Sequence, residues 1–67
     1  MSERQTLWGV YDPRQWQMIV ERAKHPADGQ RGALLTHRQT GAYCLMCAGV
    51  YRSVPRAWAQ RRHMPVS

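Results

Sequence analysis

The run Gly41-Ala-Tyr-Cys-Leu-Met-Cys-Ala-Gly-Val-Tyr51 is the longest in the chain without a charged or strongly polar side chain. It contains both cysteines and two of the three tyrosines, and basic sequence flanks it on each side. A segment of this composition is expected to be the central buried element of a small domain. The fold therefore depends on whether this run is a strand or a helix.

Two patterns compete over this run. In the first, Ala33–His37 is a strand, Arg38–Gly41 turns the chain, and Ala42–Cys47 returns as the second strand of a hairpin. In the second, Tyr43, Cys47, Val50 and Val54 form a helical stripe, since they are spaced i, i+4, i+7 and i+11. We favour the hairpin, because Gly49 would weaken a helix by about 1 kcal/mol relative to alanine.

The segment Asp12-Pro-Arg-Gln15 carries the features of a helix start. Asp12 suits the N-cap, Pro13 the first helical position, and Gln15 the third position of a capping box. Apolar residues then follow at i, i+3, i+4 and i+7, as on one face of a helix: Trp16, Ile19, Val20 and Ala23. This pattern predicts a helix from Pro13 to Lys24 that ends before Pro26.

The chain ends are predicted to add one strand and one helix. Thr6–Tyr11 is rich in β-forming residues and is expected to be a short strand. A helix over Val54–His63 would follow Ser53 as its cap, with Val54, Ala57 and Trp58 on its inner face. The predicted fold is a small α+β domain of the order β-α-β-hairpin-α, and the alternative is an all-α bundle with Gly41–Ser53 as its central helix.

Length and composition place the chain in a broad class. Its 67 residues make one domain over residues 1–67, of which residues 1–5 are expected to be disordered. No run approaches the roughly 18 apolar residues of a membrane span, and the N-terminus lacks the apolar core of a signal peptide. We therefore expect a cytoplasmic protein that has no membrane partner and keeps its cysteines reduced.

The charge points to an acidic partner. Ten Lys and Arg residues, nine of them Arg, face four Asp and Glu residues, which gives a net charge of +6. Such a field favours polyanions or acidic protein surfaces. The candidate macromolecule-binding residues lie at the borders of the central run and along the C-terminal helix: Arg38, Arg52, Arg56, Gln60, Arg61, Arg62 and His63.

We expect a non-enzymatic binding module that docks on a macromolecule and modulates or inhibits it. Small inhibitors and adaptors of phages and plasmids are often built in this way. Trp8 or Tyr11, if exposed, would serve as anchors on an acidic protein partner. The alternative is a nucleic-acid-binding protein that uses its Arg-rich C-terminal helix, placed second because charge is its only support. No small-molecule substrate is predicted.

The two cysteines allow a further alternative. Cys44-Leu-Met-Cys47 is a C-x-x-C pair, which could hold zinc together with His37 and His63. In a regular strand, however, the two thiols point to opposite faces and cannot share one metal. We favour two small buried side chains and no cofactor over zinc, over a redox dithiol, and over an enzyme that uses the histidines as acid and base.

Overall fold

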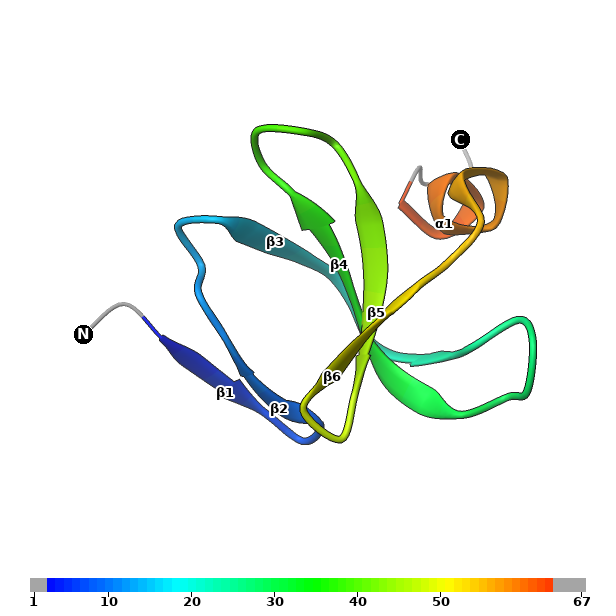
Figure 1. Ribbon diagram of the computed structural model, residues 1–67, viewed down its shortest axis with the longest axis horizontal. Helices are drawn as coiled ribbons and strands as arrows, with labels where there is room; N and C mark the ends of the chain where they lie inside the picture. The colour runs from blue at the N-terminus through cyan, green and yellow to red at the C-terminus, as the bar shows by residue number, and fades with distance from the viewer. Residues whose placement is uncertain (1–2, 64–67) are drawn as a thin grey trace.

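The computed structural model describes residues 3–63 and has seven elements (Figure 1). A two-stranded sheet pairs β1 with β2, and a four-stranded antiparallel sheet has the order β3-β4-β5-β6. One short helix, α1, follows the sheet. The bounds are β1 (Arg4–Thr6), β2 (Gly9–Tyr11), β3 (Trp16–Lys24), β4 (Arg31–His37), β5 (Tyr43–Cys47), β6 (Val50–Ser53) and α1 (Arg56–His63). The α+β class is confirmed, whereas the predicted order of elements is not.

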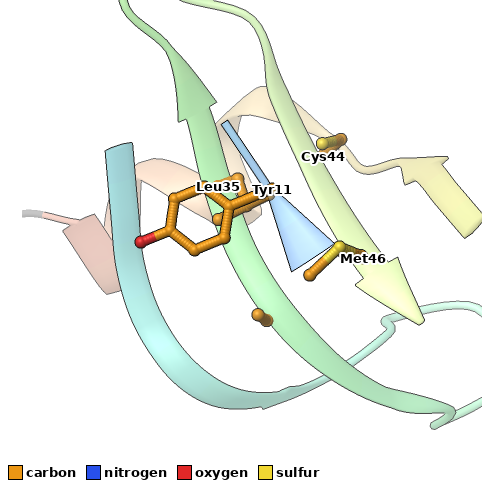
Figure 2. Packing of buried hydrophobic residues seen from close by; sticks show 5 residues of the cluster. Tyr11, Leu35, Cys44 and Met46 are labelled. Atoms are coloured by element: carbon orange, nitrogen blue, oxygen red, sulfur yellow. The ribbon is translucent and has the colours of Figure 1, made fainter. Parts of the chain in front are cut away.

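The two central strands are covered on both faces. One face is covered by the hairpin of β1 and β2, and the buried residues there form the hairpin-side cluster: Tyr11, Ala33, Leu35, Cys44 and Met46. Trp8, Trp16 and Met18 pack against this cluster. The helix-side cluster consists of Leu34, Leu45, Cys47 and Ala59, with partly buried side chains around it that include Val54 and Trp58. Figure 2 shows part of the hairpin-side cluster, where side chains of β2, β4 and β5 meet. Because β4 and β5 are buried on both sides, they read as continuous apolar runs.

The hairpin over residues 33–47 is confirmed. The strands β4 and β5 pair from Ala33↔Met46 to Thr36↔Tyr43, and Gly41 closes the turn with a φ of 75°. The alternative central helix over Gly41–Ser53 is wrong, because this segment forms β5, a two-residue turn and β6. The turn residues Ala48 and Gly49 have φ values of 50° and 81°, which match the twist of a tight hairpin.

The predicted helix over Pro13–Lys24 is wrong. Its cap signal instead makes a tight turn: the Asp12 carboxylate accepts from Arg14 N at 2.9 Å, and the Asp12 carbonyl accepts from Trp16 N at 3.0 Å. The chain then leaves the turn as β3. An aspartate followed by proline supports a turn as well as a helix start, because both satisfy the same free amides.

Irregularities in β3 explain why its sequence resembles a helix. Met18 pairs with Leu35, Val20 with Leu34 and Ala23 with Gly32, so β3 has an extra residue in each of the two intervals. Each extra residue shifts the alternation of side chains by one position. Ile19, Val20 and Ala23 therefore all reach the helix-side cluster, at spacings that a helical face would also give.

The N-terminal segment is a hairpin rather than the single strand predicted over Thr6–Tyr11. Thr6 Oγ1 donates to Gly9 O at 2.9 Å and accepts from Trp8 N at 3.0 Å, which tightens the turn. Gly49 N donates to Trp8 O at 2.6 Å and so joins this hairpin to the β5–β6 turn. The strand β1 includes Arg4 and Gln5, from the segment expected to be disordered, whereas Met1 and Ser2 lie outside the described residues.

The C-terminal helix is present but shorter than predicted. Its first turn closes through a hydrogen bond from Ala59 N to Pro55 O at 3.0 Å. Ala59 is fully buried and Trp58 half-buried, whereas Ala57, predicted to face inward, is exposed. No helix within residues 3–63 has the length and apolar character needed to cross a membrane.

Candidate functional site

The outer surface of α1 carries three exposed arginines, Arg56, Arg61 and Arg62. The Arg62 guanidinium carbon lies 4.1 Å from the centroid of the Trp58 ring, and its Nη1 donates to Trp58 O at 3.2 Å. The Arg56 guanidinium carbon lies 6.0 Å from the Tyr43 ring centroid. Contact with an aromatic ring orients a guanidinium and leaves its charge uncompensated. The last turn of α1 holds Arg61, Arg62 and His63, whose basic side chains suit the negative end of the helix dipole.

The end of α1 is tied to β5 by a polar contact. Tyr43 Oη and His63 Nδ1 lie 3.1 Å apart, and the two rings meet edge to face with centroids 6.0 Å apart. Gln60 lies half-buried on the same helix. Five of the seven predicted binding residues therefore belong to α1: Arg56, Gln60, Arg61, Arg62 and His63.

The other two predicted binding residues have structural partners. Arg52 Nη1 donates to both Asp28 carboxylate oxygens, at 3.1 and 3.0 Å, and to Gln30 Oε1 at 2.8 Å. A hydrogen bond from Gln30 N, assisted by Arg52, lowers the pKa of Asp28. Arg38 Nε donates to Pro13 O at 2.8 Å and so braces the β2–β3 turn. These contacts occupy Arg52 and Arg38 within the fold.

Sequence reasoning missed a second basic group. Arg22, Lys24 and Arg31, together with Ala23, line a recess of about 150 Å³ at the end of β3 and β4 where a loop joins the two strands. Arg22 and Lys24 fell within the helix predicted over Pro13–Lys24, and Arg31 fell beyond its end. Only the pairing of Lys24 with Arg31 across the two strands brings the three together.

The basic end of the molecule consists of these two groups, namely the recess residues Arg22, Lys24 and Arg31 and the helix residues Arg56, Arg61 and Arg62. Both α1 and the turn between β3 and β4 lie at the end of the long axis opposite the β1–β2 hairpin (Figure 1). Within residues 3–63 the one ion pair joins Arg52 to Asp28. The six cations of the basic end are thus without a carboxylate partner in the described part of the chain.

The cysteines lie on opposite faces of β5. Cys44 belongs to the hairpin-side cluster and Cys47 to the helix-side cluster, as expected of a strand. Burial raises the pKa of Cys44 to about 11, and it also raises the pKa of Cys47. Both thiols are therefore protonated near neutral pH, which does not suit a redox nucleophile. Their positions on opposite faces of β5 do not allow them to share one metal ion.

The histidines proposed as partners of the cysteines have other neighbours. His37 packs edge to face on Trp16, with centroids 4.9 Å apart, and His63 contacts Tyr43. Within residues 3–63 no three His, Cys, Asp or Glu side chains are grouped so that they could hold a metal ion. The C-x-x-C pair is accommodated as two core side chains.

Comparison of the chain with protein-family models, with curated proteins and with solved structures finds no match.

Proposed function

We propose that this protein is a non-enzymatic module that binds nucleic acid through its basic end. The observation that carries the proposal is the gathering of six cationic side chains, none with a carboxylate partner among residues 3–63. Phosphate groups along a nucleic acid repeat at short intervals and can engage such an array at several points. Five of the six cations are arginines, whose planar fork suits phosphate oxygens.

The distribution of apolar side chains supports nucleic acid over an acidic protein as the partner of this end. Protein interfaces are usually anchored by buried aromatic or aliphatic side chains at their centre. Among residues 3–63, the large apolar residues that are exposed lie elsewhere, on the β1–β2 hairpin and β6: Leu7, Val10, Val50 and Tyr51. The basic end thus offers charge, and none of these exposed large apolar residues lies on it, which is typical of phosphate contacts.

The same geometry favours binding that does not depend on base sequence. Arg62 already occupies one face of Trp58, and Tyr43 is engaged by His63 and approached by Arg56. Stacking of bases on these rings would require those contacts to break. We therefore expect phosphate contacts to dominate and affinity to be similar for different sequences.

A salt titration with paired variants tests this proposal. The association constant falls as the salt concentration rises. Each phosphate contact adds about 0.9 to the magnitude of the slope of its logarithm against log salt for duplex DNA, and about 0.7 for a single strand. The double variant Arg61→Gln with Arg62→Gln should reduce the magnitude of this slope by about 1.8 on a duplex. The control, Arg4→Gln with Arg14→Gln, removes the same charge from the opposite half of the chain and should change the slope far less. Equal effects of the two variants, or affinity independent of salt, would contradict the proposal.

A second candidate function, docking on a protein and modulating it, has separate support. Leu7 is 64% and Val50 60% exposed, and they adjoin Trp8 and Gly49, whose backbones are hydrogen-bonded. The anchors suggested by the sequence are less suitable, because Tyr11 is buried in the core and Trp8 is half-buried. Cross-linking in the native host would support this candidate if Leu7→Ser with Val50→Ser lost a protein adduct that Arg61→Gln with Arg62→Gln kept.

A further inference from the structure

The recess at the end of β3 and β4 concentrates like charges. Lys24 and Arg31 are register partners on adjacent antiparallel strands, and Arg22 lies two residues before Lys24. Like charges directly opposite each other destabilise a sheet. An arrangement that holds three cations together without a carboxylate is costly for folding alone, and a bound anion would offset the repulsion.

The loop that follows Lys24 contains one carboxylate, and this carboxylate is engaged elsewhere. Both oxygens of Asp28 accept from Arg52, and one also accepts from Gln30 N at 3.1 Å. Asp28 is therefore bound to β6 and to its own loop, and it does not line the recess. The cations of the recess keep their charge available for a ligand.

The backbone on both sides of the recess is held in place. His25, next to Lys24, is buried, and its two ring nitrogens lie 3.0 Å from Ser53 O and 3.1 Å from Ala27 N. Gly32, next to Arg31, lies so close to β5 that an added Cβ would be 2.5 Å from Met46 O. The strands that present Lys24 and Arg31 are therefore fixed, which lowers the entropy lost when a ligand binds.

The size of the recess limits the ligand. Sites for drug-sized molecules and cofactors usually measure about 300–1,000 Å³. At about 150 Å³, the recess suits a compact group such as a phosphate better than a whole nucleotide. Ala23 lines it between the cations and packs against the helix-side cluster, to which Trp58 and Ala59 of α1 also belong.

We infer that the recess formed by Arg22, Lys24 and Arg31 is a binding site for a single phosphate group. The inference deepens the proposed function and rests on it in one respect: the phosphate would be a phosphodiester of the nucleic acid that α1 also contacts. The same chemistry would accept free inorganic phosphate. The two sources are separated by the two arms of the experiment.

The first arm uses inorganic phosphate as the probe and follows backbone amide shifts by NMR. Saturable shifts at residues 22–24 and 31 are expected in the wild type and in the Arg4→Gln with Arg14→Gln control. Lys24→Gln with Arg31→Gln should abolish them. Because this variant removes a like-charge pair, its Tm should be equal to or above that of the wild type, which excludes unfolding as the cause. Shifts spread evenly over the surface, or lost equally in the control, would overturn the inference.

The second arm measures duplex binding between 50 and 200 mM salt. Because the recess is inferred to hold one phosphate, its loss should reduce the magnitude of the salt slope by about 0.9. The loss of affinity over this range should then be about threefold smaller for Lys24→Gln with Arg31→Gln than for the wild type. The control should behave like the wild type. A recess variant that matches the control here, with no localised phosphate shifts, overturns the inference and leaves the proposed function standing. Localised phosphate shifts with no duplex binding uphold the recess as a site for free phosphate and overturn the proposed function.

Discussion

The two faces of the central sheet are covered in different ways. On the hairpin side, Tyr11 is buried over β4 and β5, and Trp8 and Trp16 extend the contact. On the helix side, α1 contributes one fully buried side chain, Ala59, with Trp58 half-buried beside it. Two hydrogen bonds also hold the β1–β2 hairpin in place. Gly49 N donates to Trp8 O, and Trp8 Nε1 donates to Glu21 O at 3.0 Å.

This difference indicates a division of roles. The hairpin side uses large aromatic residues as packing, which suits a chain of 67 residues with a small core. On the helix side, three of the eight residues of α1 are exposed arginines. The element that covers this face with one fully buried side chain therefore carries part of the charge from which we propose the function.

Leu34 and Leu35 offer the most direct test of this comparison, because they are adjacent in β4, fully buried, and point to opposite clusters. Replacement of either by alanine should cost about 2–5 kcal/mol, depending on how far the surroundings collapse into the cavity. We expect the stability cost of Leu35→Ala to lie near the upper limit, since the β1–β2 hairpin is held by hydrogen bonds and cannot move inward. Leu34→Ala should lie near the lower limit, because the short helix can settle. Urea unfolding measures both.

A total stability of about 3–10 kcal/mol is typical for a domain of this length. Leu35→Ala is therefore expected to leave a substantial unfolded population at 25 °C. The reverse order of the two costs would show that α1, not the hairpin, is the rigid cover.

The ionisation of Cys44 gives the next largest effect and reports on the hairpin side. Its folded pKa of about 11 lies above the ordinary thiol value, because burial disfavours the thiolate. Between about pH 9 and 11 the unfolded chain loses this proton and the folded chain keeps it, so the free energy of unfolding falls as pH rises. The loss should approach about 2 kcal/mol.

Unfolding by urea at pH 8 and pH 10.5 measures this loss, and Cys44→Ala provides the control. The Cys44→Ala variant should lose less stability over the same interval than the wild type. An identical pH dependence in both proteins would assign the effect to other groups, such as Tyr51, whose pKa burial also raises.

The turn between β5 and β6 contains a strained residue at the point where the hairpin docks. Ala48 has a φ of 50°, a left-handed conformation that costs a residue with a Cβ about 1–2 kcal/mol. Ala48→Gly should therefore raise the free energy of unfolding by up to about 1 kcal/mol, after the larger entropy of glycine in the unfolded chain is subtracted. The matched change Gly49→Ala, at a φ of 81°, should lower it. Stabilisation by both changes would contradict the strain argument.

The parts of this molecule that the sequence predicts are those set by neighbouring residues. The β4–β5 hairpin follows from a short apolar run on either side of a turn with Gly41. The apolar spacing after Ser53 predicts α1, although Ser53 itself ends β6 and is not the cap. The strand β3 could not be recognised in the same way. Its two extra residues move Ile19, Val20 and Ala23 to one face, and no local property separates this from a helical face.

The candidate site was predictable only in the part that lies on one element. The arginines of α1 are close in sequence and could be grouped before the structure was known. The ion pair of Arg52 with Asp28 joins residues 24 positions apart, and the recess requires the register of Lys24 with Arg31. Such groupings depend on strand pairing, which sequence spacing does not specify when bulges are present.

The smallest expected effect lies on the helix side, where Tyr43 Oη meets His63 Nδ1 at the end of α1. Tyr43→Phe removes this contact and keeps the ring beneath Arg56. Since the bond is exposed, its loss should cost about 0.5 kcal/mol or less, at the low end of the range for protein hydrogen bonds. A double-mutant cycle with His63→Ala isolates the coupling, because the packing of each ring is counted in the single variants. A coupling near zero would mean that packing of Trp58 and Ala59 alone holds the helix. A coupling well above 1 kcal/mol would mean that α1 is fixed more firmly than its burial indicates, and the difference between the two faces would then be smaller than we infer.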